Sequence, residues 1–242
     1  MTPLPRLWVL DASRTAALVC MVWFHFNFDL MLFGHLPPGV MFTGNWPYFA
    51  RGIAGSFLFL AGVSLWLAHS GGVRWPAFWR RFGIVAGAAA LVSGVTYFSF
   101  GGGYVRFGIL HAIAASSLIG LAFLRLPATV TLVIALGVFL APMGMRSDLF
   151  AAPWLLWLGL APEVPPMMDY EPLLPWAAPF LAGIALADLA DRAGLWQSLS
   201  RWRMTGRMGR ALAWPGQHSL AVYLIHQPVL FGFVWLYTYL GL

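Results

Sequence analysis

Residues Leu10–Leu30 read LDASRTAALVCMVWFHFNFDL, and MLF follows them. From Thr15 to Phe33 the chain is almost continuously apolar, about the 20 residues that a helix needs to cross a membrane. The run does not alternate between apolar and polar residues, which excludes a β-barrel strand. His25 and Asp29 lie inside it. The stretch therefore predicts a membrane-spanning helix that carries ionisable groups at membrane depth.

The composition of the whole chain agrees with a membrane protein. Its 242 residues are 60% hydrophobic and 9% charged, whereas a soluble domain carries roughly 25% charged residues. This excludes an ordinary soluble domain and a disordered protein. A single cysteine, Cys20, excludes a disulfide scaffold. We expect an all-α integral membrane protein in contact with the lipid bilayer. The chain has no repeats, linkers or low-complexity tails, so one domain is expected over residues 1–242.

The same length criterion gives about seven spanning helices. They are predicted at residues 15–33, 48–69, 82–100, 105–124, 127–143, 172–189 and 218–240. The apolar stretch 150–160 is too short to span and contains Pro153 and two tryptophans, which favours an interfacial or re-entrant segment. An eighth span is the alternative, but three prolines between residues 162 and 166 end the stretch too soon.

Arginine positions predict the orientation. All fourteen cationic residues are Arg, and eleven of them fall before the first span or in alternate loops: Arg6, Arg14, Arg74, Arg80, Arg81, Arg125, Arg192, Arg201, Arg203, Arg207 and Arg210. Because positive residues concentrate on the cytoplasmic side, we expect a cytoplasmic N-terminus and a periplasmic C-terminus. A sequence pI near 10.1 is also typical of nucleic-acid-binding proteins. Here the Arg residues lie in short loops between apolar runs, so no nucleic acid is expected as a partner.

Several ionisable side chains lie at predicted membrane depth, where each costs at least ~2.5 kcal/mol on insertion. His25 and Asp29 are four residues apart and share a helix face, so the acid can orient the imidazole as a general base. The groups assigned to the outer half are His25, Asp29, Arg51, Arg106, His111 and Asp169. We expect them to converge in one polar pocket. The alternative for the two Arg residues is structural ion pairing with Asp29 or Asp169.

Five blocks of the chain resemble a known family. Ten residues separate Arg14 from His25, which resembles the Arg–His signature of transmembrane acyltransferases. Four other blocks resemble bacterial proteins with a heparan-alpha-glucosaminide N-acetyltransferase catalytic-like domain, and the resemblance as a whole extends from Arg6 to Leu230. These blocks are FARGIAGSFLFLAGVSL (Phe49–Leu65), RFGILHAIAASSLIGL (Arg106–Leu121), DYEPLLPW (Asp169–Trp176) and HSLAVYLIHQPVL (His218–Leu230).

The resemblance implies acyl transfer across a bacterial inner membrane. The donor would be cytoplasmic acetyl-CoA, and the acceptor a hydroxyl or amine of an extracytoplasmic sugar or glycan. By this likeness His25 is the catalytic histidine and Arg14 holds a CoA phosphate. In the lysosomal transferase the position of His25 looks like an asparagine, and the catalytic histidine lies in the following loop. His35 therefore stays open as the base.

The predicted site combines the likeness with the chemistry of the residues. Histidine suits the base that acyl transfer needs, Arg and Tyr supply donors near the thioester oxygen, and Arg forks suit CoA phosphates. The same cytoplasmic Arg residues are also what topology demands. The assignments are catalytic His25, Asp29 and His111; substrate-binding Arg51, Arg106, Asp169, Tyr170, Trp176, His226 and Gln227; and donor-binding Arg14, Arg80 and Arg81.

Three other functions fit part of the pattern. His25 and His226 at similar depth can in principle ligate haem, but Asp29 and Arg106 are unusual beside a haem edge, so neither haem nor metal is expected. The short chain also fits a non-enzymatic accessory or scaffold subunit that binds other membrane proteins. A transporter is disfavoured because the sequence shows no inverted repeat. The residues do not separate O- from N-acylation.

Overall fold

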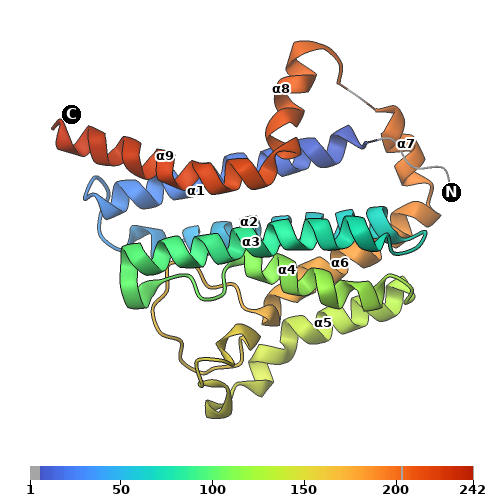
Figure 1. The fold of residues 1–242 in the computed structure, drawn as a ribbon, viewed down its shortest axis with the longest axis horizontal. Helices are drawn as coiled ribbons and strands as arrows, with labels where there is room; N and C mark the ends of the chain where they lie inside the picture. The colour runs from blue at the N-terminus through green and yellow to red at the C-terminus, as the bar shows by residue number, and fades with distance from the viewer. Residues whose placement is uncertain (1–5, 203, 242) are drawn as a thin grey trace. The chain divides into compact units, whose positions relative to one another are not determined.

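The computed structural model describes residues 6–202 and 204–241, and Figure 1 shows their path. These residues form helices joined by turns and loops, with one isolated parallel bridge, so the all-α prediction is confirmed. Arg203, counted above for the orientation, lies outside the described residues. The α-helices are α1 (Trp8–Leu32), α2 (Trp46–His69), α3 (Trp75–Phe100), α4 (Ile109–Gly120), α5 (Ala128–Met145), α6 (Leu173–Arg192), α7 (Leu195–Arg201), α8 (Gly206–Gln217) and α9 (Ser219–Tyr239). The 3-10 turns are η1 (Val40–Phe42), η2 (Gly101–Gly103), η3 (Leu121–Phe123), η4 (Asp148–Phe150) and η5 (Leu156–Leu158).

Six of the described helices are long and apolar enough to cross a membrane: α1, α2, α3 extended through η2, α5, α6 and α9. The chain is therefore a multi-pass membrane protein. The span predicted at residues 105–124 corresponds to a shorter apolar helix, Ile109–Phe123, because residues 105–108 are not helical. The stretch 150–160 contains no α-helix and only short 3-10 turns.

The chain divides into two compact units. The terminal unit comprises Thr2–Phe57 and Trp196–Leu242, and the central unit comprises Leu58–Leu195. Helix α2 thus gives its first half to the terminal unit and its second half to the central unit. The single domain expected over residues 1–242 stays a prediction.

The central unit is built on a close approach of α2 and α6. A Cβ atom on Gly62 would meet the carbonyl oxygen of Phe180, and one on Gly183 would meet the carbonyl oxygen of Phe59. Gly62 of α2 therefore lies against the backbone of α6, and Gly183 of α6 lies against the backbone of α2. Small residues occupy such positions where membrane helices pack closely. The side chain of Phe180, with none of its surface exposed, lies against Gly120 of α4.

In the terminal unit α1 and α9 run parallel. The ring of His25 lies 5.0 Å from that of His226, Phe33 lies 5.0 Å from Phe231, and His35 contacts Thr238 beyond the end of α1. Residue numbers thus rise together along both helices, which lie side by side in Figure 1.

Candidate active site

A group of four polar side chains lies between α1 and α9, and we call it the polar cluster: His25, Asp29, His226 and Gln227. Asp29 is fully buried. Its Oδ1 accepts a hydrogen bond of 2.9 Å from Nε2 of Gln227. The imidazole rings of His25 and His226 pack edge to face. The polar cluster concentrates hydrogen-bonding groups among mostly apolar neighbours on the two helices, where burial without partners is costly.

Within the described part of the chain, three buried atoms of the polar cluster have no hydrogen-bond partner: Oδ2 of Asp29, Nε2 of His226 and Oε1 of Gln227. Nδ1 of His226 lies 2.6 Å from the carbonyl oxygen of Tyr223. Because a carbonyl only accepts, Nδ1 carries the proton, and Nε2 of the neutral ring presents a lone pair. Gln227 donates its amide to the carboxylate, so its oxygen is the unpaired atom. With Asp29 ionised, all three atoms are acceptors.

This arrangement differs from the predicted pairing of Asp29 with His25. The two residues share a helix face, but among the described residues no hydrogen bond joins them, because the carboxylate takes Gln227 from α9 instead. The catalytic roles of His25 and Asp29 stay predictions. Gln227 is the partner that the sequence placed near the site without assigning it to Asp29.

Arg51 and His35, two other predicted residues of the terminal unit, lie exposed. The guanidinium carbon of Arg51 lies 5.7 Å from the ring centroid of Tyr48, near the start of α2. Nε2 of His35, the alternative base, lies 2.7 Å from Oγ1 of Thr238. His35 therefore ties the loop after α1 to the last turns of α9, and its role as a base stays a prediction.

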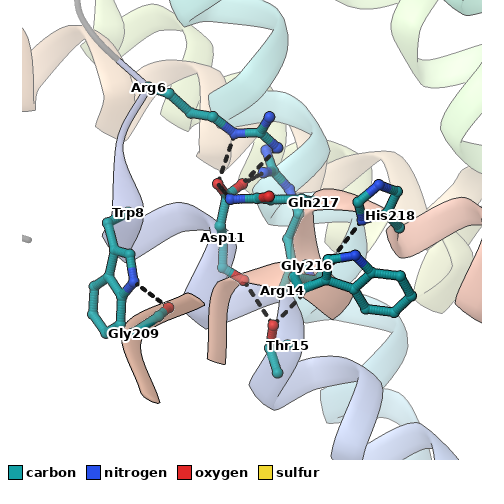
Figure 2. Close-up of polar contacts among 10 residues, drawn as sticks. Arg6, Trp8, Asp11, Arg14, Thr15, Gly209, Gly216, Gln217 and His218 are labelled. Atoms are coloured by element: carbon teal, nitrogen blue, oxygen red, sulfur yellow. Dashed lines mark hydrogen bonds and ion pairs between the residues drawn. The ribbon is translucent and has the colours of Figure 1, made fainter. Parts of the chain in front are cut away.

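A second polar group joins the first turns of α1 to the end of α8 (Figure 2), and we call it the Asp11 junction after its central carboxylate. The Asp11 side chain is 3% exposed and accepts from Nε of Arg6 at 2.7 Å and Nη1 of Arg14 at 2.9 Å. Nε2 of Gln217 donates to the same carboxylate at 3.3 Å. Arg14, predicted to hold a CoA phosphate, is thus an ion-pair partner of Asp11, and its role toward the donor stays a prediction.

The backbone completes the Asp11 junction (Figure 2). Oγ1 of Thr15 donates to the carbonyl oxygen of Asp11 at 3.1 Å and accepts from the backbone N–H of Gly216 at 2.9 Å. A Cβ atom on Gly216 would meet that same carbonyl oxygen. The sequence did not indicate this junction as a site, although Asp11 and Arg14 at a spacing of three residues were its local signal.

In the central unit His111 caps its own helix. Nδ1 of His111 accepts from the backbone N–H of Gly108 at 3.3 Å, just before the first turn of α4. The proton of the neutral ring therefore sits on Nε2, which lies 3.3 Å from Oγ of Ser93. Ser93 in turn donates to the carbonyl oxygen of Val105 at 2.6 Å. Both ring nitrogens of His111 thus have structural partners, and its catalytic role stays a prediction.

Asp169 lies at the same helix start. Its Oδ2 accepts from the backbone N–H of Ile109 at 3.1 Å, where the amino end of a helix favours negative charge. Burial raises the pKa of Asp169, and the Ile109 hydrogen bond opposes this. The hydroxyl of Tyr170 donates to the carbonyl oxygen of Leu156 at 2.6 Å. Burial raises the pKa of Tyr170 as well, against the charge of Arg146.

The remaining predicted residues of the central unit are Arg106, Trp176, Arg80 and Arg81. The guanidinium carbon of Arg106 lies 5.2 Å from the ring centroid of Tyr104, and its Nε is buried without a partner. Trp176 is half-buried in the first turn of α6. Arg80 and Arg81 are exposed on α3, and Arg81 lines a small hollow that also involves His69.

The structure therefore distributes the predicted site over both units. The terminal unit holds His25, Asp29, Arg51, His226, Gln227 and Arg14; the central unit holds Arg106, His111, Asp169, Tyr170, Trp176, Arg80 and Arg81. The convergence of the outer-half residues in one pocket stays a prediction. In the described part of the chain no group of three or more His, Cys, Asp or Glu side chains is placed to hold a metal ion. The expectation of no haem or metal is untested.

The comparison with known proteins bears on this geometry. The family model described as Heparan-alpha-glucosaminide N-acetyltransferase, catalytic, matches residues 6–228. No curated protein and no solved structure matches the chain. The matched range includes the polar cluster, the Asp11 junction and the capped start of α4. Since it covers most of the 242 residues, the chain belongs to the heparan-alpha-glucosaminide N-acetyltransferase catalytic-domain family.

Proposed function

We propose that this protein is a membrane-embedded acyltransferase that moves an acyl group, acetyl in the first instance, from cytoplasmic acyl-CoA to a hydroxyl or amine of an extracytoplasmic sugar or glycan. The observation that carries the proposal is the polar cluster, which holds three unpartnered buried acceptors in a member of an acetyltransferase family. Buried polar atoms are normally satisfied. A group that donates hydrogen bonds, as a hydroxyl or amine does, is the ligand that would satisfy them.

The chemistry assigns distinct roles within the polar cluster. The acceptor hydroxyl or amine gives its proton to a histidine, its oxygen or nitrogen attacks the thioester carbon, and the carbon–sulfur bond breaks. The histidine then gives that proton to the sulfur, so CoA leaves as its thiol, and the acceptor carries the acyl group. His25 is the proposed base, and Nε2 of His226 is the second candidate because its lone pair is unpartnered. Asp29 and Gln227 would hold the acceptor by accepting its hydrogen bonds.

The donor would be held by arginine. Acyl-CoA carries phosphates, which guanidinium groups bind in forked pairs. The exposed positions of Arg80 and Arg81 on α3 fit such a ligand, whereas only 23% of the Arg14 side-chain surface is exposed. We therefore assign the phosphate contacts first to Arg80 and Arg81. In this scheme Arg51, Arg106, Asp169, Tyr170 and Trp176 shape the acceptor side.

The proposal includes seven passes with a cytoplasmic N-terminus in a bacterial inner membrane. The parallel course of α1 and α9 supports it, because two spans of one chain run parallel only when an odd number of crossings separates them. The long helices α2, α3, α5 and α6 supply four crossings. The shorter helix α4 with η3 would supply the fifth. The Arg distribution then puts the N-terminus inside.

Acetyl-CoA turnover by the purified full chain in nanodiscs tests the proposal. Release of CoA is followed with and without mixed periplasmic glycans, for the wild type and for His25→Ala, His226→Ala and the matched control His218→Ala. His218 is exposed at the junction of α8 and α9, so its loss should leave turnover unchanged. Loss of a general base should lower turnover by about 100-fold or more while acetyl-CoA still binds.

The outcomes separate the candidates. A large loss in His25→Ala assigns the base to His25, and a large loss only in His226→Ala assigns it to His226. If the wild type neither binds nor consumes acetyl-CoA, the enzyme proposal fails. The accessory-subunit function would then be the better account of the same fold.

A further inference from the structure

Helix α8 has three distinct faces. Gly209, Ala213 and Gly216 are buried and lie along one face. At 100° per residue, Arg207, Arg210 and Trp214 fall within about 60° of one another on a second face. Met208 and Leu212 lie on a third face. The centre of this apolar face is about 90° from that of the small face and about 150° from that of the cationic face. The composition of α8 therefore changes from small to cationic to apolar around its circumference.

The small face fixes α8 against α1. Nε1 of Trp8 donates to the carbonyl oxygen of Gly209 at 3.0 Å. Two turns later, the backbone N–H of Gly216 donates to Thr15 at 2.9 Å. Both ends of the small face are thus held by hydrogen bonds to α1, so the direction of the other two faces is set by the terminal unit itself.

The two outward faces are exposed. Met208 and Leu212 have 68% and 42% of their surface exposed, and Trp214 has 57%. Arg207 and Arg210 are exposed, and among the described residues neither forms an ion pair. No Asp or Glu occurs anywhere in residues 193–242. The cationic face of α8 is therefore not neutralised by its own segment.

We propose that α8 is a surface helix that binds the phosphate headgroups of anionic phospholipids through Arg207 and Arg210. Met208 and Leu212 enter the adjoining acyl-chain region, and Trp214 lies at the boundary. An apolar face beside a cationic face is the pattern of a helix that lies in the membrane interface, and Trp favours that depth. Anionic lipid complements the uncompensated arginines. This inference does not rest on the proposed acyl transfer.

Lipid binding by the detergent-solubilised full chain tests it, with a fluorescent phosphatidylglycerol as the probe and anisotropy as the readout. Each Arg near an anionic surface contributes about fivefold in affinity, which corresponds to ~1 kcal/mol. Arg207→Gln with Arg210→Gln should therefore weaken binding by about 25-fold. The matched control is Arg125→Gln with Arg192→Gln, which removes the same charge from the connection before α5 and from the last residue of α6 and should retain wild-type affinity. Both altered pairs are exposed, so each variant should fold.

Three results would overturn the proposal. Equal weakening in both double variants would assign the affinity to net charge alone. Equal wild-type affinity for phosphatidylcholine would remove the selectivity for anionic headgroups. Displacement of the probe by glycerol phosphate at comparable concentration would indicate a site for a soluble anion. Selective loss in the α8 variant, with phosphatidylglycerol preferred over both competitors, supports it.

Discussion

Replacing Asp11 with Asn should weaken the attachment of α1 to α8. The carboxylate is almost fully buried and accepts from Arg6, Arg14 and Gln217. The Arg6 side chain is 63% exposed, so that pair contributes at most about 1 kcal/mol. Arg14 is only 23% exposed, and a hydrogen bond to a charged group contributes about 1.5–3 kcal/mol.

The contributions of the three partners together give the expected loss of stability. The longer bond from Gln217 adds about 0.5–1 kcal/mol, and the single side-chain oxygen of Asn still accepts one of these hydrogen bonds. We expect Asp11→Asn to lower the free energy of unfolding by about 2–4 kcal/mol. The matched change on the exposed partner, Arg6→Gln, should cost no more than about 1 kcal/mol.

Unfolding of the purified full chain by sodium dodecyl sulfate, followed by tryptophan fluorescence, measures both variants. A double-mutant cycle with Gln217→Leu then isolates the contribution of the α8 contact. If Asp11→Asn costs no more than Arg6→Gln, or if its coupling to Gln217 is zero, the Asp11 junction does not hold the two helices together and the reasoning is wrong.

Four further substitutions test the central unit. Gly183→Ala should destabilise the chain by about 1–3 kcal/mol because the new Cβ would meet the backbone of α2. The control Gly87→Ala, whose Cβ would enter open space, should stabilise α3 by up to about 1 kcal/mol. Equal effects of the two changes on thermal unfolding would contradict the close approach of α2 and α6. The raised pKa of Asp169 means that folding favours its protonated form, so its contribution to stability is lost as pH rises above the ordinary value of 3.8. Asp169→Asn should flatten this part of the pH–stability curve, and an unchanged curve would refute the assignment. Tyr170→Phe should cost about 1 kcal/mol in the same unfolding assay, and a neutral result would show that its hydrogen bond contributes nothing.

The apolar runs of the sequence predicted the positions of the long helices because crossing a membrane is a local requirement of length and composition. They placed the first span at Thr15, whereas α1 begins at Trp8. The difference arises because the polar first turns are stabilised by Arg6, Arg14 and Gln217, and Gln217 comes from the far end of the chain.

The candidate site was predicted only in part for the same reason. Their predicted depth in the membrane singled out His25, Asp29, His226 and Gln227 individually. The pairing of Gln227 with Asp29 is a tertiary contact that no local spacing encodes. The capping role of His111 involves a residue only three positions away. That contact was therefore within reach of the sequence pattern.

The pairing of the first helix with the last has a consequence for biosynthesis. Asp29 and its partner Gln227 are 198 residues apart, and a ribosome adds about 5–20 residues per second. Roughly 10–40 s therefore pass between the synthesis of Asp29 and that of Gln227, whose amide donates to the buried carboxylate. During that interval the insertion machinery or a membrane chaperone has to shield Asp29 from lipid. Ribosomal stalling before α9 would leave an inserted chain with an unpaired acid, which is the kind of intermediate that membrane quality-control proteases remove.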